Sequence, residues 1–202
     1  GGGNSTTPSL RNVQKFLQTK DGTQITSQES KVSENGIVVE ELVKSSIKLS
    51  DNPTNSQSVR LGTANTAVVK EMTFELSTNT LKEFASAFGV EKEFEVVVTS
   101  KEAEQNQKTN YARQDLYLEG FDVFSVNISV GRDVIDSFAN PAELTFDISD
   151  VNYNKNDLKI YYFSETNGTW VKAGDGGTVA GNKISVQVDH LTDFGIIREV
   201  SE

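Results

Sequence analysis

Residues 184–197 read Ile-Ser-Val-Gln-Val-Asp-His-Leu-Thr-Asp-Phe-Gly-Ile-Ile. The first half alternates aliphatic and polar residues, which is typical of a strand with one buried face. A second apolar run begins at Phe194. We therefore predict two strands joined by a tight turn at His190-Leu191-Thr192. The turn contains the single His of the chain, and the single Trp, Trp170, lies shortly before the first strand.

Similar short runs recur through most of the chain and are separated by Gly-, Asn- and Pro-containing turns. They are clearest at 37–49, 67–76, 94–98, 116–130, 144–148 and 158–163. Many short strands at this spacing favour an antiparallel β-sandwich. We predict a mainly β fold with one or two short helices.

One helix is expected inside this β region. Leu81, Phe84, Ala85 and Phe88 form an apolar stripe with helical spacing, and Gly89 is a natural end. Thr80 and Glu83 have the spacing of a capping box, so we place the helix start there.

The predicted organisation has three parts. Residues 1–9 form a flexible tether, residues 10–35 form a short helix followed by a loose connection, and residues 36–202 form the sandwich domain. The helix prediction rests on Leu10, Val13, Phe16 and Leu17, which fall on one helical face.

Composition narrows the classes of function. The 202 residues carry a formal net charge of -10 and no cysteine, so disulfides and thiolate chemistry are excluded and nucleic acid is not an expected partner. The Gly/Ser/Thr/Asn-rich opening is similar to the tether that follows the lipidated cysteine of bacterial lipoproteins. We expect an extracellular or cell-surface protein, in contact with a membrane only through an N-terminal lipid anchor.

The turn at residues 190–192 also permits chemistry. His190 could take the proton of the Thr192 hydroxyl, which would then attack the Leu191 carbonyl in an N-to-O acyl shift. The other interpretation is a packed turn in which His190 bonds a backbone carbonyl. We take the packed turn as the first interpretation and keep self-cleavage between Leu191 and Thr192 as the alternative.

This end of the chain resembles the GAIN-type autoproteolysis domain of adhesion receptors, in which a His-Leu-Ser/Thr motif is followed by Phe. Residues 71–197 also resemble a β-sandwich module of bacterial surface and S-layer-associated proteins. The resemblance implies a sandwich whose last strand follows the cleavage motif. Two receptor-family cysteines that brace the turn are replaced here by Val186 and Val188, which we expect to brace it by packing.

Two weaker patterns complete the prediction. The oxygen-rich segment 150–157 resembles a calcium loop, but Lys155 stands where an EF-hand needs Gly, so we assign no metal site and expect no cofactor. Trp170 and the aromatic run 161–163 would suit a sugar only if Trp170 were exposed beside a cleft. We therefore predict a non-enzymatic surface module, lipoprotein-like, whose ligand is an unknown protein or carbohydrate.

Overall fold

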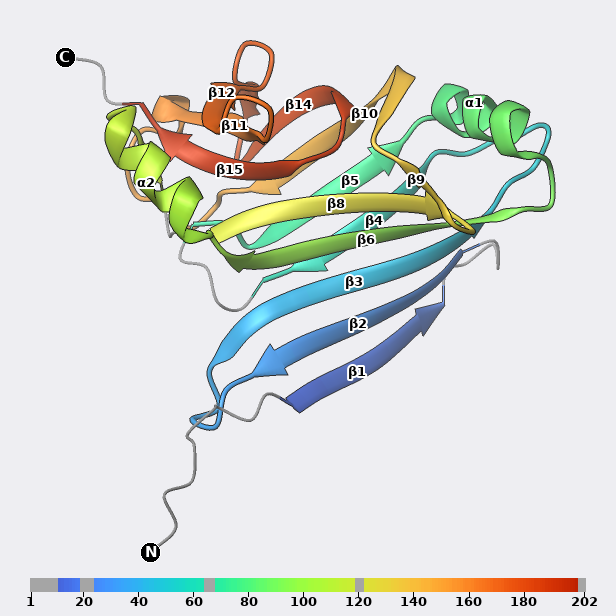
Figure 1. Ribbon diagram of the computed structural model, residues 1–202, viewed down its shortest axis with the longest axis horizontal. Helices are drawn as coiled ribbons and strands as arrows, with labels where there is room; N and C mark the ends of the chain where they lie inside the picture. Colours follow the sequence, from blue (N-terminus) through green and yellow to red (C-terminus); the bar gives the residue numbers. More distant parts are fainter. Residues whose placement is uncertain (1–10, 19–23, 64–67, 119–121, 200–202) are drawn as a thin grey trace, which may run out of the picture.

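The chain folds as two packed antiparallel sheets in a computed structural model that describes residues 11–18, 24–63, 68–118 and 122–199 (Figure 1). The predicted fold class, a mainly β antiparallel sandwich with one or two short helices, is confirmed, and the described residues contain two α-helices. The predicted tether 1–9 lies outside the described residues.

The larger sheet has ten strands among the described residues. Eight of them follow one another in the order β1 (Arg11–Gln18), β2 (Gln24–Val32), β3 (Val38–Lys48), β6 (Glu93–Glu102), β8 (Asp122–Val130), β15 (Asp193–Arg198), β11 (Leu158–Ser164) and β12 (Thr169–Lys172). The short strands β7 (Tyr117–Leu118) and β9 (Asp133–Ile135) pair with β15 and β8. The smaller sheet has five, in the order β13 (Thr178–Ala180), β14 (Lys183–His190), β10 (Ser137–Asp147), β5 (Glu71–Leu76) and β4 (Gln57–Gly62).

The core lies between the sheets, where the alternating apolar residues of both inner faces meet. In β6, Phe94, Val96 and Val98 are fully buried, and the side chains between them lie on the other face of the strand. Phe124 of the larger sheet packs edge-on against Phe146 of the smaller one, with ring centroids 5.2 Å apart. Burying apolar surface in this way is the main force that holds the two sheets together.

The first helix, α1 (Thr78–Phe88), is confirmed, but its start differs from the prediction. Ser77 caps the helix by accepting a hydrogen bond from the Thr80 N–H at 3.2 Å. Glu83 makes no capping box. Its carboxylate instead accepts the backbone N–H groups of Ala139 and Asn140 at 2.9 and 2.8 Å, and so ties the helix to β10.

The second helix, α2 (Gln105–Arg113), lies in a region that we predicted to be almost wholly β. Its sequence is polar and has no apolar stripe, so periodicity gives no signal. It covers one end of the outer face of the larger sheet (Figure 1), above a second small apolar cluster that includes Tyr111, Phe163 and Trp170. Neither helix is long and apolar enough to span a membrane, as far as the described residues extend.

The prediction for residues 10–35 is wrong. The expected helix is strand β1, and the expected loose connection contains strand β2. Eight residues are too few for a stable isolated helix, whereas all eight residues of β1 pair with β2, which pairs in turn with β3. The sandwich therefore begins well before residue 36.

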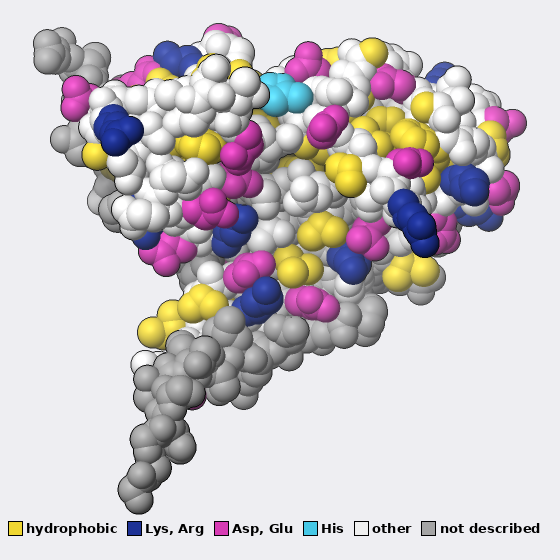
Figure 2. All heavy atoms as spheres, viewed as in Figure 1, with side chains coloured by type: hydrophobic (Ala, Val, Ile, Leu, Met, Phe, Trp, Pro, Cys, Tyr) yellow, Lys and Arg dark blue, Asp and Glu magenta, His cyan; other side chains and the backbone are white. Residues whose placement is uncertain are grey.

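Strands β1 and β2 form an overhang, by which we mean the part of the larger sheet that extends past the edge of the smaller one (Figure 1). Strand β4, the edge of the smaller sheet, lies over β3 and β6. The face of β2 that continues the core face is polar, because Gln24, Thr26, Gln28 and Ser30 alternate along it. On the opposite, solvent-facing side, acidic and basic side chains are interspersed (Figure 2). Lys31 and Glu40, for example, form an ion pair at 3.4 Å.

Candidate functional site

The predicted turn at His190-Leu191-Thr192 is the corner at which the chain passes from one sheet to the other. Strand β14 ends at His190 in the smaller sheet, and β15 begins at Asp193 in the larger one. Leu191 and Thr192 make the crossing. The predicted pair of strands is therefore confirmed, but the strands lie in different sheets and do not form a hairpin.

His190 lies at the surface of this corner, with its side chain 41% exposed (the cyan side chain in Figure 2). Its ring packs edge-on against Tyr162 of β11, with centroids 4.5 Å apart and an interplanar angle of 82°. Its Nδ1 lies 3.1 Å from Oδ1 of the neighbouring Asp189. The imidazole thus bridges the end of β14 to the larger sheet.

Leu191 and Thr192 are held by backbone carbonyls from two other segments. The Leu191 N–H donates to the Asp136 carbonyl at 2.8 Å, just before β10. The Thr192 hydroxyl donates to the Phe163 carbonyl in β11, also at 2.8 Å. A general base must lie about 2.6–3.2 Å from the proton-bearing atom that it deprotonates. In this arrangement the Thr192 proton points to Phe163 and not to the His190 ring.

The two valines that stand in place of the receptor-family cysteines are buried in β14. Val186 and Val188 are paired with Leu144 and Ala142 of β10, on the core side of the smaller sheet. Both valines therefore pack in the core, in the strand that leads to the corner. Because both side chains contact the core, the position of His190 at the end of β14 follows from the sandwich itself.

Beyond the corner, a buried polar cluster that the sequence did not reveal holds Asp193. Gln107 of α2 donates from Nε2 to Asp193 Oδ2 at 2.8 Å, and its backbone carbonyl accepts Trp170 Nε1–H at 3.1 Å. Tyr111 stacks on Trp170, with ring centroids 4.4 Å apart. Burial raises the pKa of the Tyr111 phenol, and the nearby Asp193 carboxylate raises it further. No motif marks these residues, because they come from segments far apart in the sequence.

Trp170 is the centre of this cluster and is only 2% exposed. The Gln114 side chain also forms two hydrogen bonds with the backbone of Trp170. Its Oε1 accepts the Trp170 N–H and its Nε2 donates to the Trp170 carbonyl, both at 2.8 Å. A sugar-stacking role required Trp170 to be exposed beside a cleft. That route to carbohydrate binding is therefore wrong for this residue, because α2 covers it.

The segment after the corner is built into the middle of the larger sheet. Strand β15 lies between β8 and β11, and its residues Phe194, Ile196 and Ile197 are buried. At its far end Glu199 accepts a hydrogen bond from the Tyr161 hydroxyl and pairs with Lys172 at 2.7 Å. Burial would raise the pKa of Glu199, but Lys172 and Tyr161 together hold it below its usual value.

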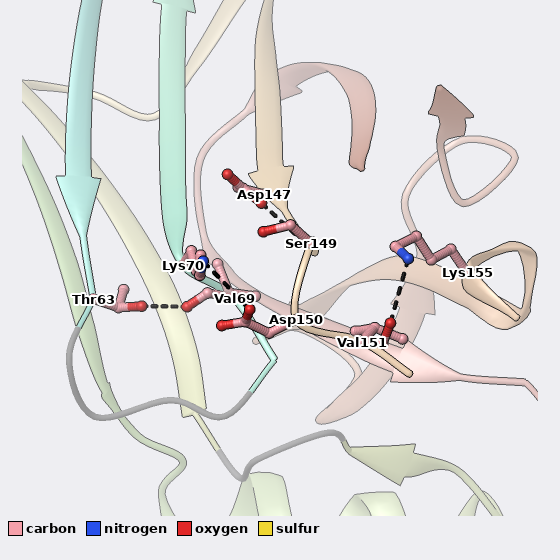
Figure 3. Close-up of polar contacts among 8 residues, drawn as sticks. All are labelled: Thr63, Val69, Lys70, Asp147, Ser149, Asp150, Val151 and Lys155. Carbon is pink, nitrogen blue, oxygen red and sulfur yellow. Dashed lines mark hydrogen bonds and ion pairs between the residues drawn. The ribbon is translucent and has the colours of Figure 1, made fainter. Parts of the chain in front are cut away.

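The oxygen-rich segment 150–157 is occupied by internal contacts (Figure 3). Lys70 pairs with Asp150 at 3.3 Å, and Lys155 Nζ donates to the Val151 carbonyl at 3.3 Å. Asn154 accepts the Asn156 N–H at 3.0 Å and so caps a short 3-10 turn at Lys155–Asp157. Across the described ranges, no group of three or more His, Asp or Glu residues is placed to hold a metal ion.

Of the sequence-predicted site residues, His190, Leu191 and Thr192 thus share one corner, and Trp170 lies under α2 close to Asp193. No protein-family model matches this chain, and no curated protein is detectably similar to it in sequence.

Proposed function

We propose that this chain is a non-enzymatic β-sandwich module that acts at the cell surface or outside the cell, in a structural, display or binding role. The observation that carries the proposal is the way the His190–Thr192 corner is bonded. The Thr192 hydroxyl donates to Phe163, the Leu191 N–H donates to Asp136, and the His190 ring packs on Tyr162. His190, at the end of the smaller sheet, thereby contacts the larger sheet, while Leu191 and Thr192 are held by backbone carbonyls of two other segments.

The proposed location rests on composition. The acidic composition and the Gly/Ser/Thr/Asn-rich residues 1–7, which are similar to the tether of a lipoprotein, support a position at the cell surface. Protease treatment of intact source cells would test it. We expect the protein to be degraded while a cytoplasmic marker survives, and protection equal to that of the marker would contradict the location.

The role of the corner is tested by mass spectrometry of the denatured protein together with Thr192→Ala and Thr192→Ser. We expect one full-length species in all three. Loss of the bond to Phe163 should lower the free energy of unfolding of Thr192→Ala by about 1 kcal/mol. Thr192→Ser keeps the hydroxyl and should stay closer to wild type. Recovery of residues 1–191 and 192–202 as separate species from wild type, but not from Thr192→Ala, would overturn the proposal.

Self-cleavage is a second candidate, because β15 is a central strand and would hold the segment after the corner in place once the chain was cut. If Thr192 rotated toward His190, its hydroxyl proton would pass to the imidazole and its oxygen would attack the Leu191 carbonyl. The Leu191–Thr192 peptide bond would become an ester, and one water would hydrolyse it to a Leu191 carboxylate and a free Thr192 amine and hydroxyl. The product 192–202 would stay bound through β15. Hydroxylamine, which cleaves esters, distinguishes this candidate: faster cleavage of wild type than of Thr192→Ala would support it.

A further inference from the structure

The open edge of β4 presents backbone groups whose direction is set by two independent contacts. The Thr63 N–H donates to the Lys70 carbonyl at 2.9 Å, so the Thr63 N–H points toward β5, which begins directly after Lys70. Along an antiparallel strand, successive residues direct their backbone N–H and C=O groups alternately toward one neighbouring strand and away from it. Ser58, Arg60 and Gly62 must therefore point these groups away from β5. The Ser58 carbonyl confirms this direction, because it accepts a hydrogen bond from Gln24 of β2 at 3.0 Å.

Gln24 closes one end of this edge and leaves the other end open. Its amide is held by Ser45 at 2.9 Å while it bonds Ser58, and so it covers the start of β4. Among the described residues no strand continues the smaller sheet past β4. The outward groups of Arg60 and Gly62, two donors and two acceptors, face the space above the overhang.

The overhang supplies a floor for this space. A strand placed beside β4 would lie above β2, whose upward-facing Thr26, Gln28 and Ser30 are polar and half-buried. It would thus continue the smaller sheet over the larger one, as β4 already does over β3. Its inward side chains would meet hydroxyl and amide groups, which favours Ser and Thr in the incoming segment.

A second copy paired symmetrically through its own β4 does not fit. A two-fold axis normal to the sheet would place the ten-stranded sheet of the second copy in the layer that β2 and β3 of the first copy already occupy. The occupant must therefore be a single strand without a sheet beneath it. Arg60 is exposed on the solvent face of β4, opposite Thr73, and it makes no ion pair with a described residue. An acidic residue opposite Arg60 would be the favourable cross-strand partner.

We infer that the β4 edge is a docking site for one extended polypeptide segment of a partner protein, rich in Ser and Thr and carrying Asp or Glu opposite Arg60. The segment adds a sixth strand to the smaller sheet by bonding the backbone of Arg60 and Gly62. This inference rests on the binding role proposed above and deepens it.

The probe is the peptide acetyl-Ser-Thr-Ser-Thr-Glu-Thr-Ser-Thr-Ser-amide, titrated into the full chain and followed by backbone amide NMR. We expect saturable shifts centred on the Arg60 and Gly62 amides, with slower hydrogen exchange at both. A peptide with Lys in place of Glu should bind roughly twofold to fivefold more weakly, as expected for losing one cross-strand charge pair. No saturable binding at millimolar peptide, or shifts centred on another surface, would overturn the inference.

Two variants at position 60 distinguish the contribution of the backbone N–H to peptide binding from that of the side chain. Arg60→Pro removes the outward N–H without touching the ladder to β5 and should abolish binding, since proline is tolerated at such edge positions. Arg60→Ala keeps the N–H and should bind both peptides alike. Binding retained in Arg60→Pro would refute the site. If that variant unfolds, the exchange of the Arg60 and Gly62 amides in wild type decides instead.

A second copy of the chain at this edge would be detected as a dimer in the same samples before peptide is added. A dimer that forms in wild type and is lost in Arg60→Ala would assign the edge to a second copy and overturn the inference. Failure of the peptide to bind leaves the intact-mass result on Thr192 unchanged, so the two proposals fail separately.

Discussion

Two ends of the sandwich, the β12 edge of the larger sheet and the β4 edge of the smaller sheet, are covered by side-chain amides to different extents. At the β12 end, α2 buries the outer face and the Gln114 amide bonds both backbone groups of Trp170, as a neighbouring strand would. At the β4 end, the smaller sheet stops above the overhang of β1 and β2, and Gln24 of β2 bonds only one carbonyl of β4. A side-chain amide can therefore stand in for a strand, but only the end that also buries apolar surface should be strongly stabilised.

The most damaging change at the covered end should be Trp170→Ala. It removes the stacking with Tyr111 and leaves a cavity under α2, and we expect a loss of about 3–5 kcal/mol in the free energy of unfolding. Urea denaturation measures the loss. Val134→Ala is the control, because Val134 is 72% exposed and should change stability by less than about 0.5 kcal/mol. Similar losses in both variants would show that the α2 cluster does not stabilise this end.

A smaller loss, about 1–3 kcal/mol, is expected for Gln114→Ala, which leaves the Trp170 N–H and carbonyl without their partner. Faster hydrogen exchange of the Trp170 amide should accompany it. Gln114→Glu is the matched variant, since it keeps an acceptor for the N–H and loses the donor to the carbonyl. Unchanged exchange in Gln114→Ala would mean that α2 closes the edge without this amide.

At the overhang, Gln24→Ala should cost less, about 1 kcal/mol, because water can reach the freed Ser58 carbonyl at the open edge. Gln28→Ala is the control on the same face of β2, and we expect it to lie close to wild type. A loss for Gln24→Ala equal to that for Gln114→Ala would remove the contrast between the two ends.

The smallest effect concerns pH and Glu199. Lys172 and Tyr161 hold its pKa below the usual value in the folded state, so the folded state gains stability from the ionised carboxylate above the ordinary glutamate pKa. That gain should disappear as the pH falls through the lowered value. Glu199→Gln should narrow the stability difference between pH 7 and pH 3, by less than about 1 kcal/mol for this partly exposed pair. Equal pH profiles for both proteins would exclude this contribution.

Sequence reasoning recovered the elements that have strong local patterns. The alternation at residues 94–98 and the apolar stripe at 81–88 predicted a buried strand and α1, because each pattern matches the geometry of one element. Residues 11–18 were misassigned because their spacing fits a helix face, while pairing with β2 supplied more hydrogen bonds than an isolated helix could. Helix α2 has too little apolar character to be recognised.

In the candidate site, too, some features could be predicted from the sequence and others could not. The motif His190-Leu191-Thr192 and the strands around it were visible in the sequence, as was the packing role of Val186 and Val188. The partners of the motif were not, because Asp136 and Phe163 contribute only backbone carbonyls, which any residue carries. The same holds for Gln107 and Gln114, whose significance depends on where α2 is placed.

By itself, the sequence determined that this protein is a cysteine-free, acidic, mainly β chain with a core of alternating apolar residues and a His-Leu-Thr turn before its last strand. Only the tertiary structure decided that this turn crosses between sheets, that Trp170 is buried under a polar helix, and that β1 and β2 extend beyond the sandwich. The physical reason is that periodicity records which face of a strand is buried. The partner of each edge and corner is set by hydrogen bonds between segments far apart in the chain.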